Sequence, residues 1–179
     1  MPGCVPRCII IDGANIMHCG SIYKDNRENA QSHSIPDVAA LLSLIRFFVV
    51  QDFDVFTVIS RKYVSPDVTN FKAGIDELIK NDLCVITPTS NLDDVVALEF
   101  AAQVNGIVLT SDLYRDHSNS SERYARIVSQ NRLNTVWSSP LPKESRNTQT
   151  RQGGHYIANK KFKFVHDNGM ELNTEGPRP

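Results

Sequence analysis

Short apolar runs alternate along the chain with longer amphipathic segments. Four of these runs have the length and composition of β-strands: residues 7–11, 55–59, 83–86 and 106–109. Ile9, Ile10 and Ile11 are consecutive β-branched residues, a pattern typical of a strand that helices bury on both faces. Three intervening segments carry apolar residues at helical spacing: residues 35–51, 68–80 and 92–104. This alternation predicts an α/β fold in which a central parallel sheet is flanked by helices.

Capping residues and weaker patterns predict the remaining boundaries. We expect Ser34 or Ile35 near the cap of the first helix, with Pro36 in its first turn. The inner face of the second helix is expected to hold Phe71, Ile75, Leu78 and Ile79. Four further segments are expected to be a long loop (18–34), a helix (121–131), a short fifth strand (136–137) and a late edge strand (162–166).

Composition and charge exclude few classes of protein. The chain has 179 residues, which predicts one domain (1–179), and its net charge of −1 indicates no particular partner. No apolar run approaches the roughly 20 residues of a membrane span, so we expect none, and we expect no signal peptide. The 4 cysteines show no zinc-binding pattern and are expected to be free thiols in a reducing compartment such as the cytoplasm.

Acidic residues occur at equivalent places along the predicted sheet. Asp12 follows the first strand, and Gly13 is expected to let the backbone turn there; Asp93 and Asp94 begin the helix after the third strand. Asp112 follows the fourth strand, with Asp116 four residues later, so both are expected on one helical face. Because parallel strands end at one edge, these carboxylates should cluster, and oxygen ligands favour a hard cation, Mg²⁺ or Mn²⁺.

Each carboxylate also has a purely structural interpretation. Asp12 and Asp112 are suited to capping a helix or forming a turn, and Asp93 and Asp94 suit the positive end of a helix dipole. Asp116 suits a solvated helix face. The sequence contains no glycine-rich dinucleotide or P-loop motif, and its 5 histidines show no ligand spacing, so we expect them on the surface or in loops.

Three motifs together resemble the NYN domain of the Regnase (Zc3h12a-like) ribonucleases, a branch of the PIN-like nucleases. They are Ile11-Asp12-Gly13-Ala14-Asn15, Leu92-Asp93-Asp94, and Thr110-Ser111-Asp112-Leu113-Tyr114-Arg115-Asp116. The resemblance runs from about residue 7 to residue 116. It implies a three-layer, Rossmann-like fold and an endonuclease that cuts RNA with Mg²⁺ held by the acidic residues.

The resemblance also implies roles for individual residues. Asp12, Asp94, Asp112 and Asp116 would hold the metal, directly or through water. Asp93 would support them, and Asn15 would orient Asp12 or contact the scissile phosphate; the structural alternative for Asn15 is a turn residue.

RNA contacts are expected from basic residues in two regions. Arg61 and Lys62 follow the second strand at the active edge, and Arg115 lies between the two late aspartates, with which it can instead pair. Residues 138–161 are expected to be a flexible basic insertion, and Lys160, Lys161 and Lys163 at its end can neutralise phosphates. The family's basic loop is here the uncharged segment 87–91.

The first functional hypothesis is a Mg²⁺-dependent endoribonuclease that cuts single-stranded or loop RNA by metal-activated water. We expect it to act in mRNA decay or RNA silencing, in the cytoplasm or in RNA granules. Its partners would be RNA and, by resemblance, a second copy of the chain or proteins of a decay or silencing complex. The alternatives are an inactive NYN module that binds RNA or protein, and a metal-dependent phosphatase or nucleotide hydrolase.

Overall fold

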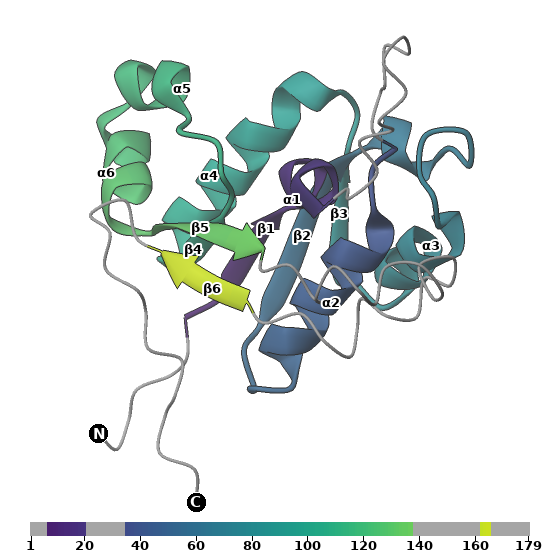
Figure 1. Cartoon of the computed structure of the whole chain (residues 1–179). Helices are drawn as coiled ribbons and strands as arrows, with labels where there is room; N and C mark the ends of the chain where they lie inside the picture. The colour runs from purple at the N-terminus through teal and green to yellow at the C-terminus, as the bar shows by residue number, and fades with distance from the viewer. Residues whose placement is uncertain (1–6, 21–34, 138–161, 166–179) are drawn as a thin grey trace, which may run out of the picture.

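A computed structural model describes residues 7–20, 35–137 and 162–165. Its centre is one sheet with the strand order β3-β2-β1-β4-β5-β6, seen in Figure 1. The strands are β1 (Ile9–Asp12), β2 (Val55–Ser60), β3 (Cys84–Thr87), β4 (Ile107–Leu109), β5 (Arg132–Trp137) and β6 (Phe162–Val165). Strands β1 to β5 pair in parallel, and β6 pairs antiparallel with β5, so the predicted α/β fold with a central parallel sheet is confirmed.

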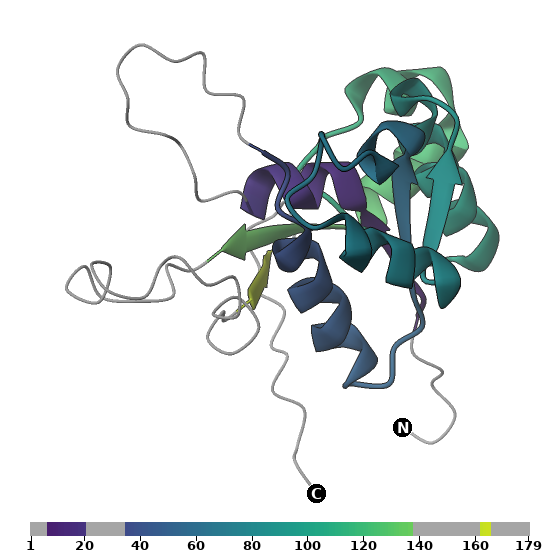
Figure 2. The same cartoon turned by 90° about the vertical axis from the view of Figure 1, so that its right-hand side faces the viewer.

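Helices cover both faces of this sheet (Figures 1 and 2). The α-helices are α1 (Gly13–Gly20), α2 (Val38–Val49), α3 (Lys72–Lys80), α4 (Asp93–Val104), α5 (Arg115–Ser120) and α6 (Glu122–Gln130). Two short 3-10 helices, η1 (Arg61–Val64) and η2 (Ser90–Leu92), follow β2 and β3. No helix of the described residues is long and apolar enough to cross a membrane.

The two faces of β1 belong to two separate hydrophobic cores. Ile9 and Ile11 pack with residues of α1, α2 and α3, whereas Ile10 packs with residues of α4 and α6. All three isoleucines are fully buried. The prediction that this strand is buried on both faces is therefore confirmed, and its last residue, Asp12, belongs to a strand in which every residue is buried.

The chain forms a helix where a loop was predicted. Helix α1 begins at Gly13, directly after β1, and continues to Gly20. The first residues of the loop predicted at 18–34 therefore belong to this helix. Gly13 has no left-handed backbone angle; a Cβ there would clash with Ile59 Cγ2 and lie 2.6 Å from Thr57 Cγ2. The glycine therefore serves the close packing of α1 on β2 rather than the predicted turn.

Helix α2 is capped by Asp37 rather than by Ser34 or Ile35. The Asp37 side chain accepts a hydrogen bond from the Ala39 N–H, and Pro36 lies outside the helix. Ile35 is also outside the helix and 61% exposed. Asp37 is the cap because its carboxylate accepts a hydrogen bond from a backbone amide that has no partner within the helix.

Helix α3 begins at Lys72, four residues later than predicted. The preceding segment instead supports α2: the Asn70 side chain accepts from the Val38 N–H and donates to Asp37. Phe71, expected inside, is 48% exposed, whereas Ile75 and Leu78 are buried as predicted.

Two late elements differ in extent from the prediction. Strand β5 begins at Arg132, because the amides of Val108 in β4 and of Thr110 directly after it donate to the carbonyls of Asn131 and Leu133. Helix α5 begins at Arg115, later than the helical face expected to carry both Asp112 and Asp116, and α6 and β6 lie close to their predicted positions. The expected insertion at 138–161 lies outside the described residues.

Candidate active site

The strand order places a topological switch point beside β1. From β1 the chain adds β2 and then β3 on one side, and β4 pairs with the other side of β1. Ligands of open parallel sheets bind outside the carboxyl ends of strands at such a point. Asp12 ends β1, and Asp112 lies shortly after β4, so the two residues flank the switch point between these strands.

Asp12 is buried and accepts three hydrogen bonds. Its Oδ1 accepts from the Asn15 N–H at 3.0 Å, which is the N-cap arrangement for α1. Its Oδ2 accepts from Thr110 Oγ1 at 2.9 Å and from Tyr114 Oη at 3.1 Å. Burial raises the pKa of Asp12 to about 6 although these bonds lower it, so the carboxylate carries a charge that its surroundings compensate only in part.

Asp112 lies in a turn outside the helix, so the predicted helical face shared with Asp116 is wrong. The Asp112 N–H donates to Thr110 Oγ1 at 3.0 Å, and Oδ1 of Asp112 accepts from the Tyr114 N–H at 2.9 Å. Helix α5 begins only at Arg115, and Asp116 lies in its first turn. Asp112 and Asp116 nevertheless line one pocket.

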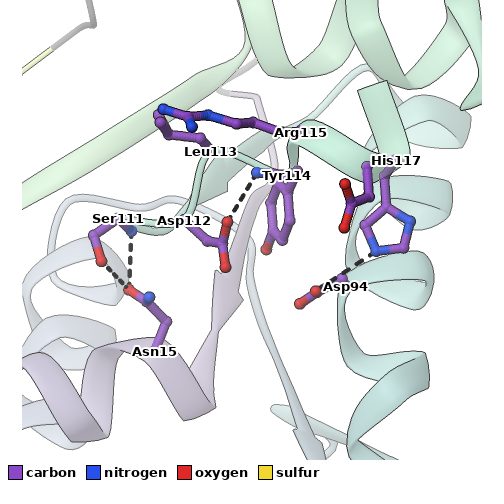
Figure 3. A pocket seen from close by; sticks show the side chains of 9 residues that line it. Asn15, Asp94, Ser111, Asp112, Leu113, Tyr114, Arg115 and His117 are labelled. Carbon is purple, nitrogen blue, oxygen red and sulfur yellow. Dashed lines mark hydrogen bonds and ion pairs between the residues drawn. The ribbon is translucent and has the colours of Figure 1, made fainter. Parts of the chain in front are cut away.

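That pocket has a volume of about 620 Å³ and lies at the carboxyl edge of β1 and β4. Its lining, shown in Figure 3, is Asn15, Asp94, Ser111, Asp112, Leu113, Tyr114, Arg115, Asp116 and His117. Asp94 comes from the first turn of α4, and its Oδ2 lies 3.6 Å from His117 Nε2. Burial raises the pKa of Asp94, and the charge of Asp112 raises it further, against the opposing effect of His117.

Asn15 is held by the turn after β4. Its Oδ1 accepts from the Ser111 N–H and from Ser111 Oγ, both at 2.9 Å (Figure 3). It also accepts from Cys19 Sγ at 3.6 Å. Because a backbone N–H can only donate, the oxygen of the amide must face Ser111. The Asn15 NH₂ group has no hydrogen-bond partner among the described residues and is available to a ligand.

Asp93 does not line the pocket. It is buried, and its carboxylate accepts from Thr87 Oγ1 at the end of β3. Burial raises the pKa of Asp93, while the Thr87 bond and the positive charge of Lys62 lower it. Asp93 thus fixes the start of α4, and with it Asp94, against the neighbouring strand.

The basic candidates follow β2 and β4, the two strands that pair with β1. Arg115 lines the pocket and forms no ion pair with Asp112 or Asp116. Arg61 and Lys62 are exposed in η1, and Lys62 Nζ lies 4.8 Å from the centre of the Tyr63 ring. Tyr63 Oη also hydrogen-bonds His18 Nε2 at 3.1 Å, and burial together with the charge of Lys62 lowers the pKa of His18.

The other predicted RNA contacts cannot be placed. Lys160 and Lys161 lie outside the described residues. The backbone of Lys163 pairs with Val136 between β6 and β5, which is all that the structure describes of this residue.

The donor chemistry of the pocket fits a hydrated divalent cation. Within the described ranges, no three Asp, Glu, His or Cys side chains converge closely enough to ligate one ion. Mg²⁺ usually keeps several waters and needs only one or two carboxylates besides substrate phosphates. Asp94 and Asp112 face one another closely enough for the charge of one to raise the pKa of the other, and a cation between them would relieve this repulsion.

Several residues of the site were not predicted. Thr110, Ser111 and Tyr114 bind the candidate carboxylates or Asn15, and His117 lines the pocket although all histidines were expected on the surface or in loops. The bonds of Thr110, Ser111 and Tyr114 to Asp12 or Asn15 join residues 96 to 102 positions apart. The sequence motif that contains these three residues therefore did not indicate these contacts.

Comparison with known proteins gives a family and a fold. The family model for the Zc3h12a-like ribonuclease NYN domain matches residues 5–155. The comparison with curated proteins found no match.

Two solved structures of nuclear protein-only RNase P 2 (PRORP2) from Arabidopsis thaliana are similar in fold. One has a TM-score of 0.52 at 19% sequence identity, covering 76% of this chain and 29% of that chain. The other has a TM-score of 0.54 at 21% identity, covering 73% of this chain and 28% of that chain. The chain thus matches less than a third of either PRORP2 chain. The family match spans most of the described residues and all three carboxylate motifs, and the chain belongs to the Zc3h12a-like ribonuclease NYN domain family.

Proposed function

We propose that this chain is a Mg²⁺-dependent endoribonuclease that cuts single-stranded or loop RNA, with Mn²⁺ as a possible substitute for Mg²⁺. The observation that carries the proposal is that Asp94 and Asp112, from separate elements, line one pocket at the switch point of the sheet, with Asp12 near enough to Asp94 for their charges to interact. The family match supports RNA as the substrate class. The restriction to single strands and loops is supported by the family resemblance alone.

Asp94 and Asp112, which line the pocket, are the residues that would hold the metal, and Asp116 belongs to the same lining. Asp12 is buried and is not part of that lining, but it lies close enough to Asp94 for the charge of Asp94 to raise its pKa. A bound Mg²⁺ supplies a nucleophilic water at neutral pH and neutralises charge that develops on the phosphate. The raised pKa values of Asp12 and Asp94 support this role, because both carboxylates carry charge that the protein alone leaves partly uncompensated.

Asn15 is suited to orient the scissile phosphate. Since Ser111 and Cys19 occupy its oxygen, the NH₂ group, which has no partner among the described residues, is the donor that a phosphate oxygen can use. A donor that is fixed before the substrate arrives stabilises developing negative charge without reorganising.

Arg115 in the pocket and Arg61 and Lys62 beyond α1 would bind flanking phosphates. Such contacts position an RNA strand and do not read its sequence. The pathway that suits this activity is mRNA decay or RNA silencing in the cytoplasm.

Incubation of the pure protein with uniformly labelled RNA tests the proposal. The reaction is run with Mg²⁺, with Mn²⁺ and with excess chelator, and the Asp112→Asn variant is the matched control. Internal cuts that need the metal and Asp112 support the proposal. Binding without cuts would indicate an inactive module, and release of terminal phosphate without internal cuts would indicate a phosphatase.

A further inference from the structure

Tyr114 connects the carboxylates that follow the two strands at the switch point. Its Oη lies 3.1 Å from Asp12 Oδ2, and its backbone N–H donates to Asp112 Oδ1 at 2.9 Å. The side chain is 2% exposed, and its ring packs in the core formed with α4 and α6. One residue therefore contacts both Asp12 and Asp112.

The backbone of Tyr114 is strained. Its φ of 46° and ψ of 39° lie in the left-handed region, which bulky side chains rarely adopt. Glycine or asparagine would occupy this position without that cost. Strain of this kind persists where the surroundings fix a residue, and it concentrates at functional sites.

The hydrogen bonds of Asp12 leave one acceptor position open. Each carboxylate oxygen offers two lone pairs. Thr110 and Tyr114 occupy both positions of Oδ2, and the Asn15 N–H occupies one of the two on Oδ1. On Asp112, Tyr114 occupies a position of Oδ1, and Oδ2 accepts no bond from the described residues.

We propose that Tyr114 is a positioning residue that fixes Asp12 and Asp112 relative to one another, at the edge of the sheet where a metal and its waters would bind. The inference rests on the proposed function and adds to it a residue that acts through the two carboxylates. Its hydroxyl bonds Asp12, which neighbours the residues that would hold the metal, and removing outer partners of a metal site typically reduces metal affinity or activity 10- to 100-fold.

Tyr114→Phe tests the inference because it deletes only the hydroxyl and keeps the ring. Tyr124→Phe is the matched control: Tyr124 on α6 donates the same kind of bond, at 3.2 Å, to Glu99 Oε2 away from the pocket. Mn²⁺ binding is measured without RNA by electron paramagnetic resonance, and cleavage is measured across a Mg²⁺ titration.

We expect Tyr114→Phe to bind Mn²⁺ about 10- to 100-fold more weakly, or to cleave that much more slowly at saturating Mg²⁺. The control should match the wild type in both assays. The melting temperature of Tyr114→Phe should fall by no more than about 2–4 °C, the effect of one hydrogen bond in a domain of this size. A Tyr114→Phe protein that unfolds would assign the hydroxyl to stability and overturn the proposal.

A double-mutant cycle separates positioning from a general structural effect. If Tyr114 acts through Asp12, Tyr114→Phe should change Mn²⁺ binding little once Asp12→Asn is present, whereas independent effects would multiply. Full multiplication, or wild-type Mn²⁺ binding and cleavage in Tyr114→Phe, contradicts the inference while leaving the proposed function intact. A wild-type protein that binds Mn²⁺ but cuts no RNA would refute the proposed function. The Mn²⁺ affinities of the wild type and of Tyr114→Phe would then still test the role of Tyr114.

Discussion

Asp12 combines a structural and a chemical role in one side chain. It caps α1 through the Asn15 N–H, as the structural interpretation of the sequence holds, and it also ends a buried strand at the switch point. Burial raises its pKa to about 6 from an ordinary 3.8. Between these pH values the folded chain holds more protons than the unfolded chain, so the contribution of Asp12 to folding stability falls as pH rises through this interval.

A cation and a proton compete for such a carboxylate, which gives a prediction for stability. At pH 7.5 Asp12 is ionised and able to support Mg²⁺ binding, whereas at pH 5.0 it is mostly protonated. We therefore expect added Mg²⁺ to raise the melting temperature more at pH 7.5 than at pH 5.0. Differential scanning fluorimetry at both pH values measures this, and an equal or larger increase at pH 5.0 would contradict it.

Arg115 provides a second prediction at this scale. Arg115→Ala should weaken RNA binding about equally for unrelated sequences and reduce the slope of log K against log salt concentration by about 0.7, the value for one phosphate contact on a single strand. Arg123→Ala is the matched control, because it also removes one arginine charge, but from a residue that is not part of the pocket lining. Arg123 Nη1 lies 2.9 Å from Oε1 of Glu99 on α4. Fluorescence anisotropy over a salt series reports both quantities. An unchanged slope for Arg115→Ala would mean that this residue touches no phosphate.

The sequence locates the carboxylates better than it locates their partners. Strand ends and helix starts are local features, so Asp12, Asp94 and Asp112 could be expected at one edge from apolar runs alone. The bonds of Asp12 to Thr110 and Tyr114 span 98 and 102 positions and depend on the pairing of β1 with β4, which no local pattern encodes.

At the scale of elements, α1 determines the geometry of the site. It starts without a connecting loop, so Asp12 and Asn15 belong to one rigid strand-to-helix junction. Apart from the cap that Asp12 provides, its sequence lacks the usual helix signals: it begins with glycine and contains few strong helix formers. Tertiary packing on β2 overrides these weak propensities, which is why the helix was not predicted.

Gly13→Ala should therefore destabilise the fold and distort the site. The added Cβ would meet Thr57 and Ile59, which are buried, β-branched and unable to move aside, so we expect a loss of about 1–3 kcal/mol. Gly74→Ala is the matched control: its Cβ would approach Phe71 Cδ1 at 2.8 Å, but that side chain is 48% exposed and can move. Urea denaturation compares the two, and equal stability of both variants would contradict this account of α1.

At the scale of the whole molecule, strand order converts separate motifs into one site. The sheet places β1 between β2 and β4, so the residues after these strands meet at one edge. Arg61 and Lys62 follow β2, and Arg115 follows β4, which puts basic residues on both sides of the carboxylates. The alternation of strands and helices was readable from the sequence, whereas the strand order that produces this arrangement required the structure.

The central claim is that Asp12 supports cleavage by water rather than by the 2′-hydroxyl of the RNA. The most direct test identifies the product ends and compares the wild type with Asp12→Asn, which keeps the side-chain shape and removes its charge. We predict 5′-phosphate and 3′-hydroxyl ends, and an Asp12→Asn variant that still binds RNA but cuts at least ~100-fold more slowly. Undiminished cutting by Asp12→Asn, or wild-type products that end in a 2′,3′-cyclic phosphate, would contradict the account.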